Sequence, residues 1–154
     1  MKTAIEIVNE IAYATLATVC PNGEPWNTPV FCAHDGFTLY WSSQPDSMHS
    51  KNIAANGQVF IVIYNSKAGQ GEGMGVYMRA KAHALDDEQQ IRRALSLLGA
   101  RRGEPFKHIE KFMGDGPQRI YMAEPSEIWT NDALRDEDGD FISDYRTPVN
   151  GKTT

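Results

Sequence analysis

The feature that most constrains the fold is a strict alternation of residue types across residues 75–85, GVYMRAKAHAL. One set of alternate positions is small or apolar: Val76, Met78, Ala80 and Ala82. The other set is large or charged: Tyr77, Arg79, Lys81 and His83. A two-residue period is typical of a β-strand with one face on a core and the other toward solvent. The chain must therefore build a sheet in which this segment is a long strand.

Further segments have strand composition and are separated by turn signals. They cover residues 13–20, 26–33, 37–43, 58–65 and 119–131. Pro29 lies inside the second of these, which predicts a sheet edge or a bulge there. The stretch QVFIVIYN is apolar throughout, so this strand is expected to be buried on both faces. Pro125 is expected to bend the last strand.

Helical spacing of apolar side chains marks four other segments. They cover residues 3–11, 47–56, 86–102 and 104–113. The third is the best defined, with an acidic start and an arginine-rich end that complement the helix dipole. Gly57 is expected to terminate the second as a C-cap. Strands joined by hairpins, with helices between some of them, predict an α+β barrel or curled sheet.

Length and charge limit the classes of protein. A chain of 154 residues, without internal repeats, is expected to form one domain. Its net charge of −5 argues against nucleic acid as the main partner. An apolar run long enough to cross a membrane is lacking, and Glu6 and Glu10 interrupt the apolar N-terminal segment, so a signal peptide is not expected. We therefore expect a cytoplasmic protein that does not bind membranes.

The two cysteines are expected to be reduced. A hairpin that turns near residues 21–24 would place Cys32 opposite the far end of the first strand, distant from Cys20. Their spacing is also not that of a zinc site.

The stretch SSQPDSMHSKNI gathers hydroxyl and cationic groups where a strand gives way to a helix. Ser47, His49, Ser50 and Lys51 all fall in the first turns of that helix. Free N–H groups and the positive end of the dipole attract anions at such a position, and these side chains suit a phosphate monoester. The alternative is an ordinary capped helix start, with Asp46 or Ser47 as the cap and a solvated polar face.

Two other motifs carry weaker signals. The stretch GQGEGMG matches neither glycine fingerprint for phosphate binding, so it is interpreted as a hairpin loop. The stretch DEDGDFISD has its glycine at position four, where a calcium loop needs it at position six, and is interpreted as a solvated turn. No serine or cysteine lies in a recognisable nucleophile motif.

Taken in order, five stretches carry a resemblance to a known family. They are ATLATVCPNGEPWNTPVF, FTLYWSSQPDSMHSKNI, QVFIVIYN, VYMRAKAHAL and YMAEPSEIW. This ordered set resembles the pyridoxamine phosphate oxidase-like family of FMN-binding split barrels, in its general-stress-type branch. The resemblance implies a six-stranded antiparallel split β-barrel with flanking helices over residues 1–131. Residues 132–154 would follow as a polar tail, extended or partly disordered.

In that family the flavin lies in a groove at a dimer interface, with its phosphate near the strand-to-helix connection. The resemblance therefore implies FMN as the cofactor, a homodimer with the cofactor at its interface, and a small-molecule substrate. The implied cofactor-binding residues are Asn27, Thr28, Pro29, Val30, Trp41, Ser42, Ser47, His49, Lys51 and Trp129. Of these, Trp129 is expected against the flavin ring, supplied by the other subunit.

Several positions depart from the family pattern. Thr28, Ala33 and Met48 stand where the true oxidases carry basic residues. The phosphate would have fewer permanent charges around it, and His49 is only partly protonated near neutral pH. We expect weaker and pH-sensitive FMN binding as a result.

A second departure concerns the substrate. The family pattern Arg-x-His-x-Arg after Trp129 falls on Arg135, Glu137 and Gly139. The Glu137 carboxylate would repel a phosphorylated substrate, so we expect an oxidoreductase that acts on another small molecule. The alternatives are a flavin sensor or carrier without turnover, and a degenerate member that only dimerises. A barrel that binds deazaflavin or haem is a further alternative, with His83 or His108 as the haem ligand.

Overall fold

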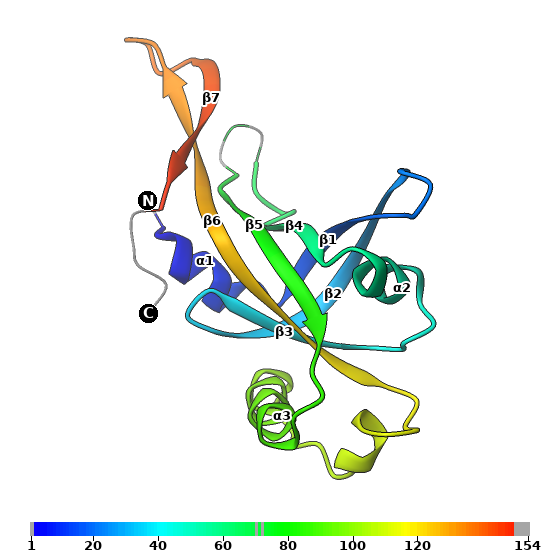
Figure 1. Cartoon of the computed structure of the whole chain (residues 1–154). Helices are drawn as coiled ribbons and strands as arrows, with labels where there is room; N and C mark the ends of the chain where they lie inside the picture. The colour runs from blue at the N-terminus through cyan, green and yellow to red at the C-terminus, as the bar shows by residue number, and fades with distance from the viewer. Residues whose placement is uncertain (1, 70, 72, 150–154) are drawn as a thin grey trace.

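The computed structural model describes residues 2–69, 71 and 73–149 (Figure 1). In chain order the elements are α1 (Ala4–Glu10), β1 (Tyr13–Val19), β2 (Pro25–Asp35), β3 (Thr38–Ser43), α2 (Met48–Ala55), β4 (Gln58–Tyr64), β5 (Gly75–Ala84), α3 (Glu88–Arg102), η1 (Ile109–Phe112), β6 (Arg119–Arg135) and β7 (Phe141–Pro148). None of the described helices is long and apolar enough to cross a membrane.

The strands form a closed antiparallel barrel. They follow the order β3-β2-β1-β4-β5-β6-β7, and a further pairing of β3 with β6 closes the ring of six. Leu39 lies opposite Ala123 in that closing pair. Helix α2 connects β3 to β4, while α3 and η1 connect β5 to β6 (Figure 1). The predicted α+β split barrel with flanking helices is confirmed.

Two apolar clusters stabilise the barrel. The larger fills its interior and includes Leu16, Ile61, Met78 and Trp41, each at most 1% exposed. In this cluster the Trp41 ring stacks on Tyr121 with centroids 5.6 Å apart. The smaller cluster lies between the sheet and α3. The alternating segment of β5 turns its small and apolar residues inward, as its period predicted.

Prolines and glycines mark irregular positions in the sheet. Around Pro29, β2 pairs with β1, whereas its pairing with β3 begins only at Cys32. The predicted sheet edge at Pro29 is thus confirmed. Near Pro125 the register between β5 and β6 shifts by one residue, which confirms an irregularity there. Gly57 does not act as the C-cap of α2, because Asn56 ends that helix in extended backbone.

The expectation that β4 is buried on both faces is wrong. Its residues alternate between buried and half-exposed, with Phe60 and Val62 on the outer face. Helix α1 does contact β4, but its buried residues Ile7 and Val8 belong to the interior cluster. An apolar run therefore does not distinguish a doubly covered strand from one with an apolar outer face.

Two other expectations need correction. Residues 104–113 do not form a regular helix, because only η1 (Ile109–Phe112) has helical geometry there. Strand β6 does not end at residue 131 but continues to Arg135 and pairs with β7. The first part of the expected tail is therefore a hairpin that projects from the barrel (Figure 1). Residues 150–154 lie outside the described part of the chain, as do residues 70 and 72 of the glycine-rich loop.

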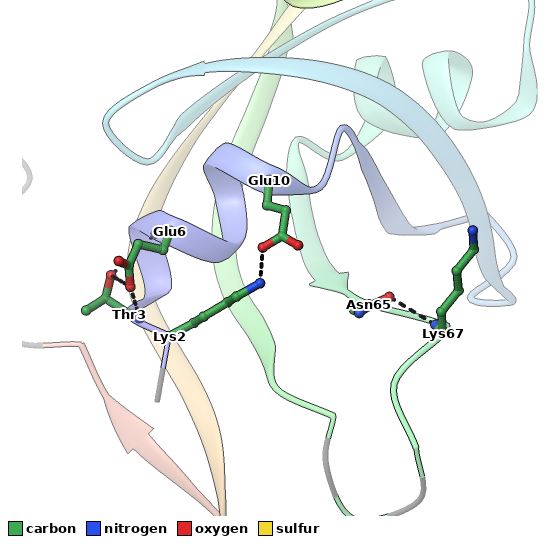
Figure 2. Close-up of polar contacts among 6 residues, drawn as sticks. All are labelled: Lys2, Thr3, Glu6, Glu10, Asn65 and Lys67. Atoms are coloured by element: carbon green, nitrogen blue, oxygen red, sulfur yellow. Dashed lines mark hydrogen bonds and ion pairs between the residues drawn. The ribbon is translucent and has the colours of Figure 1, made fainter.

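Helix α1 begins with a complete capping box (Figure 2). Thr3 Oγ1 accepts a hydrogen bond from the Glu6 N–H (3.4 Å), and the Glu6 carboxylate accepts one from the Thr3 N–H (2.7 Å). The hydrogen bonds that the Glu6 carboxylate accepts from the Thr3 N–H and from the Thr3 hydroxyl lower the pKa of Glu6. Lys2 and Glu10 form an ion pair along the same helix. The α1 start therefore satisfies its own polar groups.

Candidate functional site

The start of α2 differs from that of α1 because it lacks a side-chain cap. Ser47 occupies the N-cap position, but its hydroxyl makes no capping hydrogen bond. The first bond of the helix runs from the Lys51 N–H to Ser47 O (3.0 Å). The N–H groups of residues 48–50 therefore have no acceptor within the helix. Free donors at the positive end of a helix dipole are suited to bind an anion.

Hydroxyl and imidazole groups surround this helix start. Ser47 Oγ donates to Gln44 O (2.9 Å) and lies 2.8 Å from Ser50 Oγ. His49 Nε2 lies 2.7 Å from Ser43 Oγ and 3.3 Å from Ser47 Oγ. We call Ser43, Ser47, His49 and Ser50 the α2 cluster. The structure thus brings together three predicted residues with Ser43, which the sequence analysis missed.

Burial weakens the basicity of the imidazole in the α2 cluster. Desolvation lowers the pKa of His49 from its ordinary value of 6.5. The resting cluster therefore holds a neutral imidazole at neutral pH. The permanent positive charge comes from Lys51, one helical step further on, whose side chain is exposed. Hydroxyls, free N–H groups and one nearby ammonium are a donor set that fits a phosphate monoester.

A buried polar contact holds α2 on the barrel. Asn52 is fully buried, and its Nδ2 donates to Thr18 Oγ1 (3.0 Å) and toward Cys20 Sγ (3.4 Å). Thr18 Oγ1 donates in turn to Trp26 O (3.4 Å). Within the described part of the chain, Asn52 Oδ1 has no hydrogen-bond partner. Asn52 therefore joins α2 to the β1–β2 hairpin, which sets the direction of the helix start.

The predicted residues on β3 point to opposite faces of the sheet. Trp41 lies in the barrel core with 1% of its surface exposed. Ser42 points the other way, toward α3, and its Oγ donates to Gln118 Oε1 (3.0 Å). It lines a hollow of about 240 Å³ together with Phe31, Leu98, Arg102 and Phe106. The side chain of Ser42 is therefore on a different face from the α2 cluster, because Ser43 is the neighbour that faces His49.

The predicted residues on β2 also alternate. Val30 is buried in the core and Thr28 is half-buried, whereas Asn27 and Pro29 are exposed. Their partners across the hairpin are residues 14–17 of β1. The side chains of Asn27 and Pro29 thus lie on the outside of the barrel, whereas that of Val30 packs in its core.

Trp129 does not contact the α2 cluster of its own chain. Its ring stacks on Phe60 with centroids 6.4 Å apart, and the Arg79 guanidinium lies 5.7 Å from its centroid. These groups occupy the outer face of β4, β5 and β6. The structure thus separates the ten predicted residues into several places.

The remaining candidate motifs have structural roles. Asp136 Oδ1 accepts hydrogen bonds from the N–H groups of Asp138 (3.1 Å) and Asp140 (2.8 Å) in the β6–β7 turn. The described residues contain no cluster of three or more metal-ligating side chains. Arg135 donates to Gly139 O and Gly71 O and so holds the hairpin against the β4–β5 loop. Glu137 is exposed in that turn.

The histidines proposed for haem and the cysteines lie apart from the cluster. His83 is exposed on β5, and His108 Nδ1 contacts Glu110 Oε1 at 2.9 Å. Both cysteines are free, which agrees with the predicted reduced state. Burial raises the pKa of the Cys32 thiol to about 11, so it is not a reactive thiolate at neutral pH.

Two residues that were not predicted from the sequence, Ser43 and Asn52, contribute most to the geometry of the α2 start. A signal for Ser43 existed, because strand alternation from Leu39 and Trp41 assigns it to the inner face. Asn52 gave no such signal, since a lone asparagine on a helix is usually exposed.

The closed antiparallel barrel assigns the chain to the class of split-barrel proteins. The uncapped start of α2 is its candidate anion site. The family model for pyridoxamine 5'-phosphate oxidase matches residues 2–132. The chain belongs to this family, as the resemblance implied. Among curated proteins, none matches the sequence.

Solved structures that share this fold include the following three. An FAD-binding protein from Mesorhizobium loti is 19% identical, with 82% of this chain and 90% of that chain covered and a TM-score of 0.63. HutZ, the haem storage protein from Vibrio cholerae, is 16% identical, with 80% and 89% covered and a TM-score of 0.68. A proposed 5-nitroimidazole antibiotic resistance protein from Bacteroides thetaiotaomicron is 14% identical, with 82% and 80% covered and a TM-score of 0.70.

Proposed function

We propose that the protein binds FMN and acts as an oxidoreductase, with the FMN phosphate at the start of α2. The observation that carries the proposal is the uncapped helix start, where Ser47 and Ser50 hydroxyls lie beside free N–H groups. Family membership and the fold shared with an FAD-binding protein support a flavin as the ligand. FMN differs from riboflavin by its phosphate group. The central claim of the proposal is therefore that the start of α2 recognises this phosphate.

Each residue of the α2 cluster has a defined task in this proposal. Ser47 and Ser50 donate hydroxyl hydrogen bonds, and the N–H groups of residues 48–50 complete the phosphate contacts. Lys51 supplies long-range positive charge, while His49 holds Ser43 and can gain a proton when an anion binds. When bound, FMN supplies the redox chemistry, and the protein places and shields it.

The proposal includes a homodimer that encloses the flavin. The outer face of β1 and β4 carries half-exposed Phe60 and Val62, and Tyr13 and Tyr64 at its margin are 61% and 49% exposed. An apolar face of this kind is typical of a protein interface. A second copy would also bring its own Trp129 toward a flavin at the interface. Sedimentation of wild type and Val62→Lys tests this part, because a buried lysine should shift a dimer to a monomer.

The first experiment compares FMN with riboflavin. Purified protein is mixed with each flavin, desalted, and its visible absorption spectrum is recorded. We expect FMN to be retained and riboflavin to bind at least about tenfold more weakly, because charge-assisted hydrogen bonds contribute about 1.5–3 kcal/mol each. Equal retention would contradict a phosphate site, and failure to hold either flavin would contradict the cofactor.

Variants locate the phosphate. Ser47→Ala combined with Ser50→Ala should weaken FMN binding and leave riboflavin binding unchanged, and Lys51→Ala should do so to a smaller extent. Ser96→Ala is the matched control, because Ser96 is an exposed helical serine on α3. If Ser96→Ala also lost the preference for FMN over riboflavin, the result would argue against the α2 start as the phosphate site.

A reduction assay separates an enzyme from a carrier. FMN-loaded protein is mixed with NADH or NADPH without oxygen, and bleaching of the flavin absorption is followed. Reduction supports an oxidoreductase that passes electrons to a small-molecule substrate. A bound flavin that neither nucleotide reduces would favour the sensor or carrier.

The same spectrum tests the other cofactors. A Soret band after incubation with haem would favour the haem alternative, to which the shared fold with HutZ lends support. The exposed His83 would then be the axial ligand to replace first, since His108 already contacts Glu110. A deazaflavin is recognised by its own absorption spectrum and would displace FMN in a competition experiment. A cytoplasmic location is part of the proposal and is tested by cell fractionation.

A further inference from the structure

The two cysteines differ in how far solvent reaches them and in what surrounds the sulfur. Cys20 is half-buried, whereas Cys32 is buried in the barrel core. The Cys20 backbone is fixed at the start of the β1–β2 turn, because its N–H donates to Glu24 O (2.8 Å) and its carbonyl accepts from the Gly23 N–H (2.8 Å). Cys20 thus combines a partly exposed side chain with a backbone that is held in place.

The side-chain amide of Asn52 is directed at the Cys20 sulfur. Asn52 is fully buried, and its Nδ2 lies 3.4 Å from Cys20 Sγ and 3.0 Å from Thr18 Oγ1. Thr18 is itself 2% exposed and donates to Trp26 O (3.4 Å). These contacts fix the plane of the Asn52 amide beside the thiol.

The oxygen of the same amide lacks a hydrogen-bond donor. Asn52 Oδ1 is buried, and no described residue donates a hydrogen bond to it. The Cys20 thiol does not supply the missing bond, since an S–H group is only a weak donor. Buried carbonyl oxygens are nearly always paired, so an orphaned one beside a nucleophilic atom indicates a group that is still to be added. A hydroxyl group attached to Cys20 Sγ would be such a donor.

The other cysteine of the chain is too far away to react with Cys20. The β1–β2 ladder runs from Tyr13, which lies opposite Phe31, to Val19 at its other end. Cys32 follows Phe31 and Cys20 follows Val19, so the two cysteines are roughly 20 Å apart, because each strand residue rises about 3.3 Å. A disulfide requires Cα atoms within about 7 Å of each other. An oxidised Cys20 is therefore not converted into a disulfide within the chain.

We propose that Cys20 is a modification site, at which hydrogen peroxide oxidises the thiol to a sulfenic acid that Asn52 stabilises. The Cys20 thiolate attacks one oxygen of the peroxide, and the O–O bond breaks. The other oxygen leaves as hydroxide and combines with the thiol proton to give water, so the sulfur is oxidised and the peroxide is reduced. The new S–OH group donates a hydrogen bond to Asn52 Oδ1. Two equivalents of a small thiol reverse the step and leave as their disulfide with one molecule of water.

The test treats full-length protein, without added flavin, with hydrogen peroxide in the presence of dimedone, which reacts with sulfenic acids. Peptide mass spectrometry then locates the dimedone adduct. We expect the adduct to form on Cys20 at least about tenfold faster than on Cys32, because burial raises the pKa of the Cys32 thiol to about 11. Equal rates on the two cysteines, or no adduct on Cys20, would overturn the proposal. No flavin takes part, so failure of the FMN proposal leaves this test unaffected.

Two asparagine variants test the role of Asn52. Asn52→Ala should lower the yield of the Cys20 dimedone adduct about fivefold in favour of the sulfinic acid, as loss of one neutral hydrogen bond allows. Each yield is divided by the rate at which iodoacetamide alkylates reduced Cys20, so that a general opening of the structure is not counted.

The matched control is Asn56→Ala, at the end of the same helix. It should keep the wild-type ratio of yield to alkylation rate, because Asn56 Oδ1 already accepts a hydrogen bond from the Gln58 N–H (3.1 Å). An unchanged ratio in Asn52→Ala, or an equal fall in both variants, would overturn the assignment of Asn52.

Discussion

Helices α2 and α3 begin in opposite ways. At the start of α3 the Asp87 side chain accepts a hydrogen bond from the Gln90 N–H (2.8 Å), and Glu88 adds negative charge to the first turn. At the start of α2 the Ser47 hydroxyl turns toward Gln44 O and Ser50, and the first turn contains no acidic residue. The start of α3 is therefore capped within the chain, whereas the start of α2 has no side-chain cap for its free N–H groups.

The two helices are also attached differently. Helix α3 buries apolar side chains, Leu98 among them, against the sheet. Helix α2 buries Ser50, Asn52 and Ile53, two of which are polar. Polar attachment is weaker in energy but more specific in direction. This difference suits a helix whose orientation must be set for a ligand.

The largest effect is expected from the apolar attachment of α3. Leu98→Ala should lower the free energy of unfolding by about 2–5 kcal/mol, because Leu98 is 2% exposed and its removal leaves a cavity. Chemical denaturation measures the loss. FMN discrimination over riboflavin should survive in the folded variant, and its loss would contradict the separation of the two helices.

The polar attachment of α2 should contribute less. Asn52→Ala removes the bonds to Thr18 and Cys20 and should cost about 1–3 kcal/mol in free energy of unfolding. Unlike Leu98→Ala, it should also weaken FMN binding because the helix start loses its fixed direction. Full FMN affinity in this variant would show that Asn52 has no positioning role.

The caps provide the most direct comparison. Asp87→Ala should cost about 1 kcal/mol in free energy of unfolding, since it removes a capping hydrogen bond. Ser47→Ala should cost less than Asp87→Ala, because Ser47 makes no such bond. Thermal or chemical unfolding of the two variants in parallel measures the difference. Equal losses would mean that Ser47 stabilises α2 in some other way.

The smallest effect concerns pH and His49. Burial lowers the pKa of His49 from 6.5, so the unfolded chain binds a proton more tightly than the folded chain. The free energy of unfolding should therefore decrease as the pH falls through 6.5 and below. His49→Gln should reduce this decrease in unfolding experiments between pH 5 and 8. The pKa of His34 is lowered by burial as well, so some of the decrease should remain.

FMN affinity should depend on pH in the opposite direction to the free energy of unfolding. A bound phosphate favours the protonated imidazole, so FMN affinity should be higher at pH 6 than at pH 8 in wild type, and His49→Gln should weaken this dependence. Equal affinities at the two pH values would show that His49 carries no charge to the phosphate.

Local patterns in the sequence determined much of this protein. The alternation in residues 75–85 predicted β5 and its buried face, the ends of α3 followed from acidic and basic residues, and Pro29 marked a sheet edge. The ordered stretches also indicated the family and placed Ser47 at a helix start. These features depend on residues that are neighbours in the chain, so a sequence displays them directly.

Only the tertiary structure decided how these parts combine. Closure of β3 on β6 and the turn into α2 place Ser43 against His49, and folding buries Asn52 against Thr18. The pairing of β7 with β6 brings Arg146 to Tyr77, although the polar composition of that segment predicted a tail. Such contacts join residues far apart in the chain, and their strength depends on burial and on which strand face each residue occupies. Composition and spacing cannot display either property, which is why the missing cap of α2, the contact of Ser43 with His49 and the contact of Arg146 with Tyr77 emerged only from the fold.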